Sequence, residues 1–462
     1  MGMKRYFGVL LCIVAFSLTS CVDKVVTSPN LTSREEIDAN PQVVIPTMTV
    51  YNGDLYPNVA PNTPKGYKPV FMFAYLRHGS RLESKAEYPV VAYEYFKMAD
   101  EAGLLTPLGK EVYAYMKWNH TNHLNRVGDL TNVGFNQHKQ IAKNCFKNFP
   151  ALFKGDAEIE SIGSSELRAA MSMVGFNEGL KECNPRLRNH MEATERVTAV
   201  IRPQKSAHNP AYSAADENEY KDFLAKEVFP KLVDWGKQFN MDNAKKAMFA
   251  DPDKFFAMLD EPEFKVLVDI YKRLAFAQNV GINDRSLIDR VFTPEERHII
   301  YRHENARWYY RCATAIHPIL ANNMVQSRIF VDYMIEHAED AMFGESNSTA
   351  HLCFGHDLNI IPIQVLFSME RMPLYFSMEN NNVDYIAERW RGYKVTPMAA
   401  NVFFIFYRNN EGDVLVRPQI NERDVEMDIE SETSYFYEWD KVKDLAYKRL
   451  AELDTIVSKN NK

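Results

Sequence analysis

The sequence lacks closely spaced cysteines. Six cysteines occur in 462 residues, and no two of them form a CxxC pair. A zinc site built from thiolates is therefore unsupported. Export to an oxidising compartment would permit one or two disulfides among the four cysteines outside the N-terminal segment, and three pairings stay open. These four are Cys145, Cys183, Cys312 and Cys353.

The sequence also lacks a surplus of positive charge. Lysine and arginine number 54, against 61 aspartate and glutamate residues, which gives a net charge of −7. This balance argues against a nucleic-acid-binding protein, which needs surplus cations to neutralise phosphates along a duplex. A small anionic substrate is compatible with it, because such a substrate requires only a local group of cations. The length suggests two or three domains, and the composition is that of a globular protein.

The apolar run at the N-terminus is too short to span a membrane. The run from Phe7 to Thr19 would form a helix of about 20 Å, whereas the hydrocarbon core of a bilayer is about 30 Å thick. Lys4 and Arg5 precede the run, and Ser20 follows it. This pattern is typical of a signal peptide, which we assign to residues 1–21.

Leu18-Thr19-Ser20-Cys21 resembles the lipobox of bacterial lipoproteins. The resemblance implies that Cys21 is lipidated and becomes the mature N-terminus. The protein would then be a periplasmic or outer-membrane lipoprotein of the bacterial cell envelope, and this lipid would be its only contact with the membrane. An ordinary cleaved signal peptide is the alternative. Residues 22–46 are polar and rich in Ser, Thr, Asn and Pro, which predicts a flexible tether.

Apolar runs predict the strands of a sheet. Pro69–Leu76 is continuously apolar and stops at Arg77, which fits a strand buried on both faces. Ala157–Ile162 and His351–Phe354 are further candidates, and each is followed by a turn and a helical pattern. The order predicts an α/β fold with a mostly parallel sheet flanked by helices. Near the C-terminus, Ala400–Tyr407 and Val414–Pro418 flank a polar turn, which predicts a hairpin.

The middle of the chain has a different character. Long charged helical stretches dominate there, for example Glu217–Phe239 and Arg302–Phe343. We therefore predict a large α-helical insert over residues 186–345. The α/β core is assigned to residues 47–185 and 346–462.

Polar side chains follow three predicted strands at the point where each strand ends. Arg77 and His78 follow the first strand, Arg168 lies just beyond the second, and His356 and Asp357 follow the third. Ligands of parallel α/β sheets bind beyond the carboxyl ends of the strands. The three groups are therefore expected to converge on one edge of the sheet.

These residue types suit the transfer of a phosphoryl group. Arg77, Arg81 and Arg168 offer planar, permanently charged groups that bind phosphate oxygens. His78 should stay neutral beside them, because like charge disfavours its protonation, and a neutral nitrogen can attack phosphorus. Asp357 can serve as the general acid on the leaving oxygen and later as the base for water. The reaction requires no metal, and no cofactor is predicted.

Arg77-His78-Gly79-Ser80-Arg81 after an apolar strand resembles the RHGxR signature of the histidine acid phosphatases, which form branch 2 of the histidine phosphatase superfamily. Other matches follow in the family's order. Leu130-Thr131-Asn132-Val133-Gly134 resembles the LTxxG segment of the family. Residues 164–172 resemble the segment with a third phosphate-binding arginine and a nearby serine, here Ser172. Gly355-His356-Asp357 resembles the HD motif.

The resemblance implies an α/β core with a helical domain and an enzyme that hydrolyses phosphomonoesters through a phosphohistidine. It implies catalytic roles for His78 and Asp357. It also implies that the substrate phosphate is bound by Arg77, Arg81, Arg168 and His356. The expected partner is a small phosphorylated molecule.

Two other histidine patterns are not assigned to this site. His337-Ala338-Glu339 resembles the His-Ala-Glu donor that multiple inositol polyphosphate phosphatases commonly have, but it lies inside a helical pattern with no strand before it. His120 and His123 have a spacing that could hold a metal, but no carboxylate or thiol stands at a defined distance. We therefore interpret His120 and His123 as surface histidines.

The substrate is less clearly indicated than the chemistry. The patterns around Pro362 and Met398–Asn401 resemble bacterial inositol polyphosphate phosphatases and phytases, and a large insert would roof a roomy pocket, with Lys85 near its entrance. The proline that the family often has two residues after the second arginine is Glu83 here. The alternatives are a broad-specificity acid phosphatase acting on sugar phosphates and a non-catalytic lipoprotein that binds a phosphate ligand.

Overall fold

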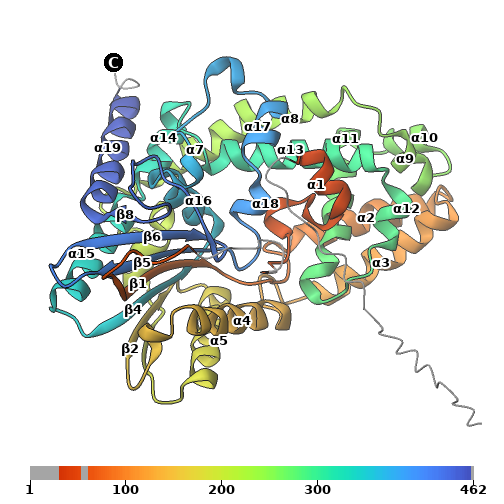
Figure 1. The fold of residues 1–462 in the computed structure, drawn as a ribbon. Coiled ribbons are helices and arrows are strands. Elements are labelled where there is room, and N and C mark those ends of the chain that lie inside the picture. The colour runs from red at the N-terminus through yellow and green to blue at the C-terminus, as the bar shows by residue number, and fades with distance from the viewer. Residues whose placement is uncertain (1–30, 52, 54–60, 459–462) are drawn as a thin grey trace, which may run out of the picture.

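The computed structural model of the protein describes residues 31–51, 53 and 61–458 (Figure 1). The predicted signal peptide with Cys21, and residues 22–30 of the predicted tether, lie outside the described residues. Among the helices of the described residues, none is both long and apolar enough to cross a membrane.

The predicted tether is wrong from Leu31 onward, because this segment is part of the packed fold. Helix α1 (Ser33–Ala39) begins with a capping box, in which the side chains of Thr32 and Glu35 each accept a hydrogen bond from the other's backbone N–H. Polar composition suggested a linker, but the segment also carries apolar residues that a linker would not bury. The buried ones are Ile37, Val43, Val44 and Ile45.

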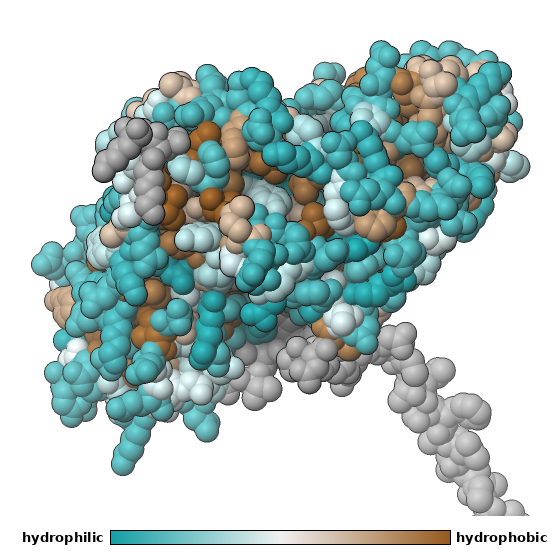
Figure 2. Space-filling model, turned by 90° about the horizontal axis from the view of Figure 1, so that it is seen from above, coloured by the Kyte–Doolittle hydropathy of each residue, from teal (hydrophilic) through white to brown (hydrophobic). Residues whose placement is uncertain are grey.

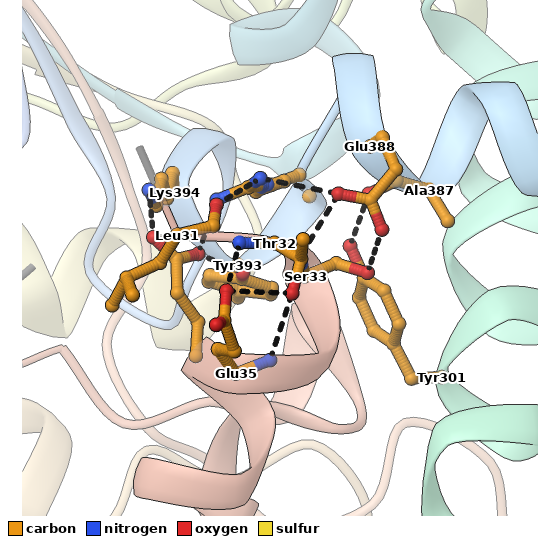
Figure 3. A network of polar contacts seen from close by, with 12 residues as sticks. Leu31, Thr32, Ser33, Glu35, Tyr301, Ala387, Glu388, Tyr393 and Lys394 are labelled. Atoms are coloured by element: carbon orange, nitrogen blue, oxygen red, sulfur yellow. Dashed lines mark hydrogen bonds and ion pairs between the residues drawn. The ribbon is translucent and has the colours of Figure 1, made fainter. Parts of the chain in front are cut away.

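Polar contacts fix α1 against the short helices α17 (Val383–Arg389) and α18 (Gly392–Val395) (Figure 3). Ser33 donates its N–H to Oε2 of Glu388 at 2.9 Å and its hydroxyl to Oε1 of the same carboxylate at 2.5 Å. The first described helix is thus joined to a part of the chain some 350 residues later.

One eight-stranded sheet runs through the described part of the chain, in the order β3-β2-β4-β1-β5-β6-β7, and β8 pairs with β6. β1 lies in the interior of this order, between β4 and β5. The strands are β1 (Lys68–Arg77), β2 (Glu158–Gly163), β3 (Arg188–Glu192), β4 (Ser348–Gly355), β5 (Asn401–Arg408), β6 (Val414–Ile420), β7 (Arg423–Asp424) and β8 (Tyr437–Glu438).

The predicted α/β class is confirmed, and the sheet is mixed. β1 pairs in parallel with β4, and β2 pairs in parallel with both β4 and β3. β5 and β6 form the predicted hairpin, and β5 continues the sheet antiparallel to β1. Because β1, β2 and β4 run in the same direction, their carboxyl ends lie at one edge of the sheet.

The core lies on both faces of β1, as its continuous apolar run predicts. Successive side chains of a strand point to opposite faces, so Phe73 and Tyr75 face one side while Met72 and Ala74 face the other. Figure 1 shows helices on both sides of the sheet. The Met72 face packs on α4 (Asn132–Asn148) and α5 (Leu167–Cys183), and the Phe73 face packs on α15 (Arg328–Phe343), α16 (Asp357–Leu366) and α19 (Trp439–Ser458).

β3 is a strand that the sequence does not indicate. Its residues Arg-Asn-His-Met-Glu have no alternation of apolar and polar side chains. β3 pairs with β2 alone and lies at the edge of the sheet, where several of its residues are exposed. An edge position tolerates this polar sequence because it requires little burial.

The middle of the chain is mainly helical, but the predicted helices are shorter than their patterns suggest. The stretch Arg302–Phe343 contains three helices, because α13 ends at Cys312 and Pro318 starts a new one. Proline is well suited to the first position of a helix, because the N–H that it lacks would have no partner there. The helices not yet given bounds are α2 (Glu87–Glu101), α3 (Pro107–His123), α6 (Glu195–Ile201), α7 (Ala214–Phe223), α8 (Phe229–Gly236), α9 (Asp242–Met248), α10 (Pro252–Phe256), α11 (Glu263–Ala275), α12 (Ser286–Val291), α13 (Pro294–Cys312) and α14 (Pro318–Val325).

The helical region lies to one side of the sheet in Figure 1, and its surface seen from above is mainly hydrophilic, with apolar residues in small separate groups (Figure 2). The division of the chain into core and insert at residues 186 and 345 stays a prediction. The four cysteines of the described residues are free thiols, so the disulfides that export would permit are not formed among them.

Candidate active site

The candidate site is built on the loop that follows β1, at the edge where β1 and β4 end. The N–H of His78 donates to the carbonyl of Gly355 at 2.9 Å, and the carbonyl of His78 accepts from the N–H of Ala399 at 3.0 Å. The N–H of Gly79 donates to Oγ of Ser172 in α5 at 3.0 Å. The loop is therefore held by β4, by the turn before β5 and by α5, and the three predicted strand-end groups lie together.

Two glycines allow this loop to contact α4 closely. A Cβ on Gly79 would lie 2.4 Å from the carbonyl oxygen of Gly134, and a Cβ on Gly134 would lie 2.1 Å from the carbonyl oxygen of Ser80. Any side chain at either position would push the loop away from the helix. Thr131 caps α4 and donates its N–H to the carbonyl of Ser80 at 2.9 Å. The segment that resembles LTxxG thus supports the arginine loop.

His78 is buried, and one ring nitrogen is already engaged. Nδ1 lies 3.0 Å from the carbonyl oxygen of Gly79. Because a carbonyl can only accept, this contact requires the proton on Nδ1 and leaves a lone pair on Nε2. Burial lowers the pKa of His78 well below its usual value, and the charges of Arg77, Arg81 and Arg168 lower it further. Nε2 is therefore an unprotonated nitrogen close to three cations.

Arg77 joins the first strand end to the third. Its guanidinium donates through Nη1 to the carbonyls of Thr47, at 2.9 Å, and Thr396, at 2.8 Å. Nη2 lies 3.0 Å from Oδ2 of Asp357, and the side chain of Arg77 is 1% exposed. These contacts fix the arginine and the carboxylate relative to each other.

Asp357 begins helix α16, and its carboxyl lies among cations. Burial raises the pKa of this carboxyl, but the charges of Arg77, Arg311, Arg81 and Arg168 outweigh burial and hold the pKa below its usual value. The group is therefore a carboxylate at neutral pH when no anion is bound.

His356 lies beside His78 at the same edge, with 5.5 Å between the ring centres. Its Nε2 contacts Oγ of Ser164 at 2.9 Å, and its backbone N–H donates to the hydroxyl of Tyr75 at 3.0 Å. Burial lowers the pKa of His356 well below its usual value, and the charge of Arg202 adds to this effect. His356 thus belongs to a neutral pair of histidines surrounded by arginines.

Arg81 and Arg168 complete the group of cations that the sequence predicts. Burial, together with the charges of Arg77 and Arg168, lowers the pKa of Arg81 to about 10, yet the side chain stays charged at neutral pH. Arg168 donates through Nη1 to Oε2 of Glu166 at 2.8 Å, and the other oxygen of Glu166 lies 2.7 Å from Arg202. The fork of Arg168 is thus oriented by a carboxylate that Arg202 shares.

Several guanidinium nitrogens at this edge are buried without a hydrogen-bond partner in the described part of the chain. Buried donors of this kind cost stability unless an acceptor satisfies them. A phosphate group carries several acceptor oxygens and matches forked donors. The nitrogens are Nε of Arg77, Arg81, Arg168 and Arg202.

The structure adds two cations that the sequence does not indicate. Arg202 follows α6, and Arg311 lies in the last turn of α13, in the helical region. Neither carries a local motif, because each reaches the site only through the packing of helices distant in sequence. The buried Glu83, which replaces the family's usual proline, pairs with Arg273 of α11 at 3.2 Å. Lys85 is exposed and contacts Glu87 at 3.3 Å.

The fold is similar to that of several solved phosphatases. A Bifidobacterium longum multiple inositol polyphosphate phosphatase, in complex with inositol hexasulfate, has a TM-score of 0.67 at 18% identity, over 87% of this chain and 96% of that one. A phytase from D. castellii has a TM-score of 0.58 at 13% identity, over 88% of this chain and 86% of that one. A Hafnia alvei phytase with tartrate has a TM-score of 0.50 at 12% identity, over 84% and 98%.

No curated protein matches the sequence. The family model of the histidine phosphatase superfamily (branch 2) matches residues 71–421. This range contains the loop after β1, the segment before α5 and the end of β4, and it covers most of the chain. The chain therefore belongs to branch 2 of the histidine phosphatase superfamily, and it is a phosphomonoesterase.

Proposed function

We propose that the protein hydrolyses inositol polyphosphates such as phytate by way of a phosphohistidine at His78. Arg77, Arg81 and Arg168, with His356, bind the phosphate that is removed, and Asp357 exchanges protons with the leaving group and with water. The support is the tautomer of His78, the group of arginines around it and the pairing of Asp357 with Arg77.

In the first step, Nε2 of His78 forms a bond to phosphorus while the bond from phosphorus to the ester oxygen breaks. Asp357 gives its proton to the leaving oxygen. The negative charge of the bound phosphate offsets the cations that lower the pKa of Asp357, so substrate binding itself favours the protonated acid.

In the second step, a water molecule attacks the phosphorus of the phosphohistidine. The Asp357 carboxylate accepts a proton from this water, and the bond between phosphorus and Nε2 breaks. His78 regains its lone pair, and inorganic phosphate leaves. The arginines stabilise the phosphoryl oxygens in both steps, which is usually the largest contribution to catalysis of this type.

One observation carries the assignment of a polyphosphorylated substrate. Arg311 reaches the site from α13, and its charge lowers the pKa of Asp357 more than any other cation except Arg77. Its guanidinium lies over the ring of Trp308 at 4.8 Å and forms a hydrogen bond with the side chain of Tyr220, and it makes no ion pair within the described residues. Because Asp357 faces the leaving group, a cation beside it suits a leaving group that carries further phosphates.

We expect Arg311→Met to discriminate between substrates. The KM for phytate should rise about 10-fold or more, because a hydrogen bond to a charged group contributes about 1.5–3 kcal/mol. The KM for p-nitrophenyl phosphate, whose leaving group carries no phosphate, should change less than about threefold. Steady-state phosphate release from both substrates measures this difference.

Arg307→Met provides the matched control, because Arg307 lies one turn earlier on the same helix and contacts Phe229 and Glu304. It should leave both KM values near those of the wild-type protein. An equal rise in KM for both substrates in Arg311→Met would contradict the assignment of the substrate, and so would the absence of phosphate release from phytate by the wild-type protein. Either result would favour simple monoesters such as sugar phosphates.

The pKa of His78 predicts an acid pH range for activity. A histidine with an ordinary pKa of about 6.5 would lose its nucleophilic form below pH 6. Because the pKa of His78 lies well below that value, its neutral form persists as the pH falls, and kcat/KM should not decline near pH 6.5 on the acid side. Activity should fall as the pH rises, because Asp357 must be protonated. A pH profile of kcat/KM with an alkyl phosphate tests both the acid side and the alkaline side of this prediction.

We further propose that the enzyme is exported and anchored to the bacterial cell envelope through a lipid on Cys21. The support is the sequence of residues 1–21, with its short apolar run followed by Leu18-Thr19-Ser20-Cys21. Labelled palmitate should enter the wild-type chain but not Cys21→Ser. A soluble, unlabelled wild-type protein would show that the segment is an ordinary signal peptide.

A further inference from the structure

A second group of titratable side chains lies on the sheet face covered by α15, away from the catalytic edge. Its ligand atoms, from Glu160 in β2, His351 in β4 and His337 in α15, all lie within 4.8 Å of one another. His351 precedes Gly355, the end of β4, by four residues, which places it about 13 Å from the catalytic edge.

The sheet register places these residues on one face. Glu160 is the partner of His351 on β4 and of His190 on β3, and partners in neighbouring strands share a face. His337, which was rejected above as part of a catalytic motif, lies on α15 with its ring centre 4.7 Å from that of His351. Two neighbouring strands and one helix therefore contribute the three donors of this group, and His190 of β3 lies beside Glu160 on the same face.

The hydrogen bond of His337 prepares this side chain for a metal ion. Nδ1 of His337 lies 3.0 Å from the carbonyl of Tyr333, so it carries the proton and leaves the lone pair of Nε2 available. Metal-binding histidines usually donate their other N–H to such a carbonyl. Nδ1 of His351 lies 3.0 Å from Oε2 of Glu160, and its Nε2 lies 3.1 Å from the hydroxyl of Tyr333. A metal ion bound by both side chains would replace the hydrogen bond between His351 and Glu160, and Nδ1 would give up its proton.

Access also suits a cation. The side chain of Glu160 is 41% exposed, so an ion can enter from solvent.

We propose that Glu160, His337 and His351 form a binding site for a divalent transition-metal ion such as zinc, with His190 as a fourth ligand. Two or three imidazoles with one carboxylate suit zinc, copper or nickel and do not suit magnesium. Zinc ligands lie about 2.0–2.1 Å from the ion and so about 3.3 Å from each other, which small side-chain movements achieve here. The ion would tie β2 and β4 to α15 and would stabilise the sheet behind the catalytic loop.

Zinc titration of the full-length protein after dialysis against a chelator tests the site. We expect one zinc per chain by calorimetry, a rise in Tm on zinc addition and no binding of magnesium. His337→Ala should weaken zinc binding at least about 100-fold, because loss of an outer partner of a ligand alone costs about 10–100-fold. It should also abolish the rise in Tm.

His120→Ala is the matched control, because His120 is a histidine of another helix, where it stacks on Tyr93. This variant should bind zinc as the wild-type protein does. Glu160→Gln, at a half-exposed position, repeats the test without changing α15. Both site variants should keep phosphatase activity, which separates this proposal from that for the catalytic edge. No zinc binding by the wild-type protein, or equal binding by His337→Ala, would overturn the proposal.

Discussion

Replacement of His78 by alanine is expected to remove phosphatase activity. Without Nε2, no bond to phosphorus can form on the protein, and kcat for p-nitrophenyl phosphate should fall by at least about 1,000-fold, since loss of a covalent nucleophile commonly costs more than this. The remaining arginines should still bind phosphate, so that inorganic phosphate continues to protect the variant against thermal unfolding. Spectrophotometric release of p-nitrophenol and a melting curve with phosphate measure the two properties.

His208→Ala is the matched control, because His208 is an exposed histidine with no role in the candidate site. It should retain the activity of the wild-type protein. Turnover by His78→Ala close to that of the wild-type protein would contradict the phosphohistidine mechanism. A wild-type protein that binds phosphate ligands but releases no phosphate would instead favour the non-catalytic alternative.

Asp357→Asn is expected to have an effect that depends on the leaving group. The asparagine keeps the shape of the side chain but cannot supply a proton. For p-nitrophenyl phosphate, whose leaving group departs without a proton, kcat/KM should fall less than about 10-fold. For an alkyl phosphate, kcat/KM should fall about 100–10,000-fold, which is the usual contribution of general acid catalysis.

Hydrolysis of the phosphohistidine, the second step, provides an independent test of Asp357→Asn. Because Asp357 also accepts the proton of the attacking water, Asp357→Asn should accumulate phosphohistidine when p-nitrophenyl phosphate is the substrate. Rapid mixing should then show a burst of p-nitrophenol close to one equivalent per site. Equal losses of kcat/KM on both substrates, together with no burst, would assign the proton transfer to another group.

The sequence predicts the centre of the site well because that part depends on local patterns. The run before Arg77 is continuously apolar, so β1 and its end are evident, and the same holds for β4 before His356. The hairpin of β5 and β6 and the last helix, Trp439–Ser458, also follow from local alternation or spacing. Convergence of these ends then follows from the parallel pairing of β1, β2 and β4.

Other features depend on tertiary packing and were missed or wrong. Leu31 to Pro46 were predicted as a tether because of their polar composition, but burial of a few apolar side chains orders them. β3 has no strand pattern because it is a polar edge strand. Arg311 carries no motif, since only the packing of α13 against α16 brings it near Asp357.

The position of β1 in the sheet has a consequence for how the protein is made. Its two neighbours, β4 and β5, follow it by about 270 and 320 residues, so during synthesis the apolar strand emerges long before either partner exists. At about 5–20 residues per second, this interval is roughly 15–60 s. Over that time the nascent chain carries an apolar strand without its partners, and such unpaired strands are prone to aggregate. Arg77 also requires the carbonyl of Thr396, so the catalytic centre can form only after nearly the whole chain has been synthesised.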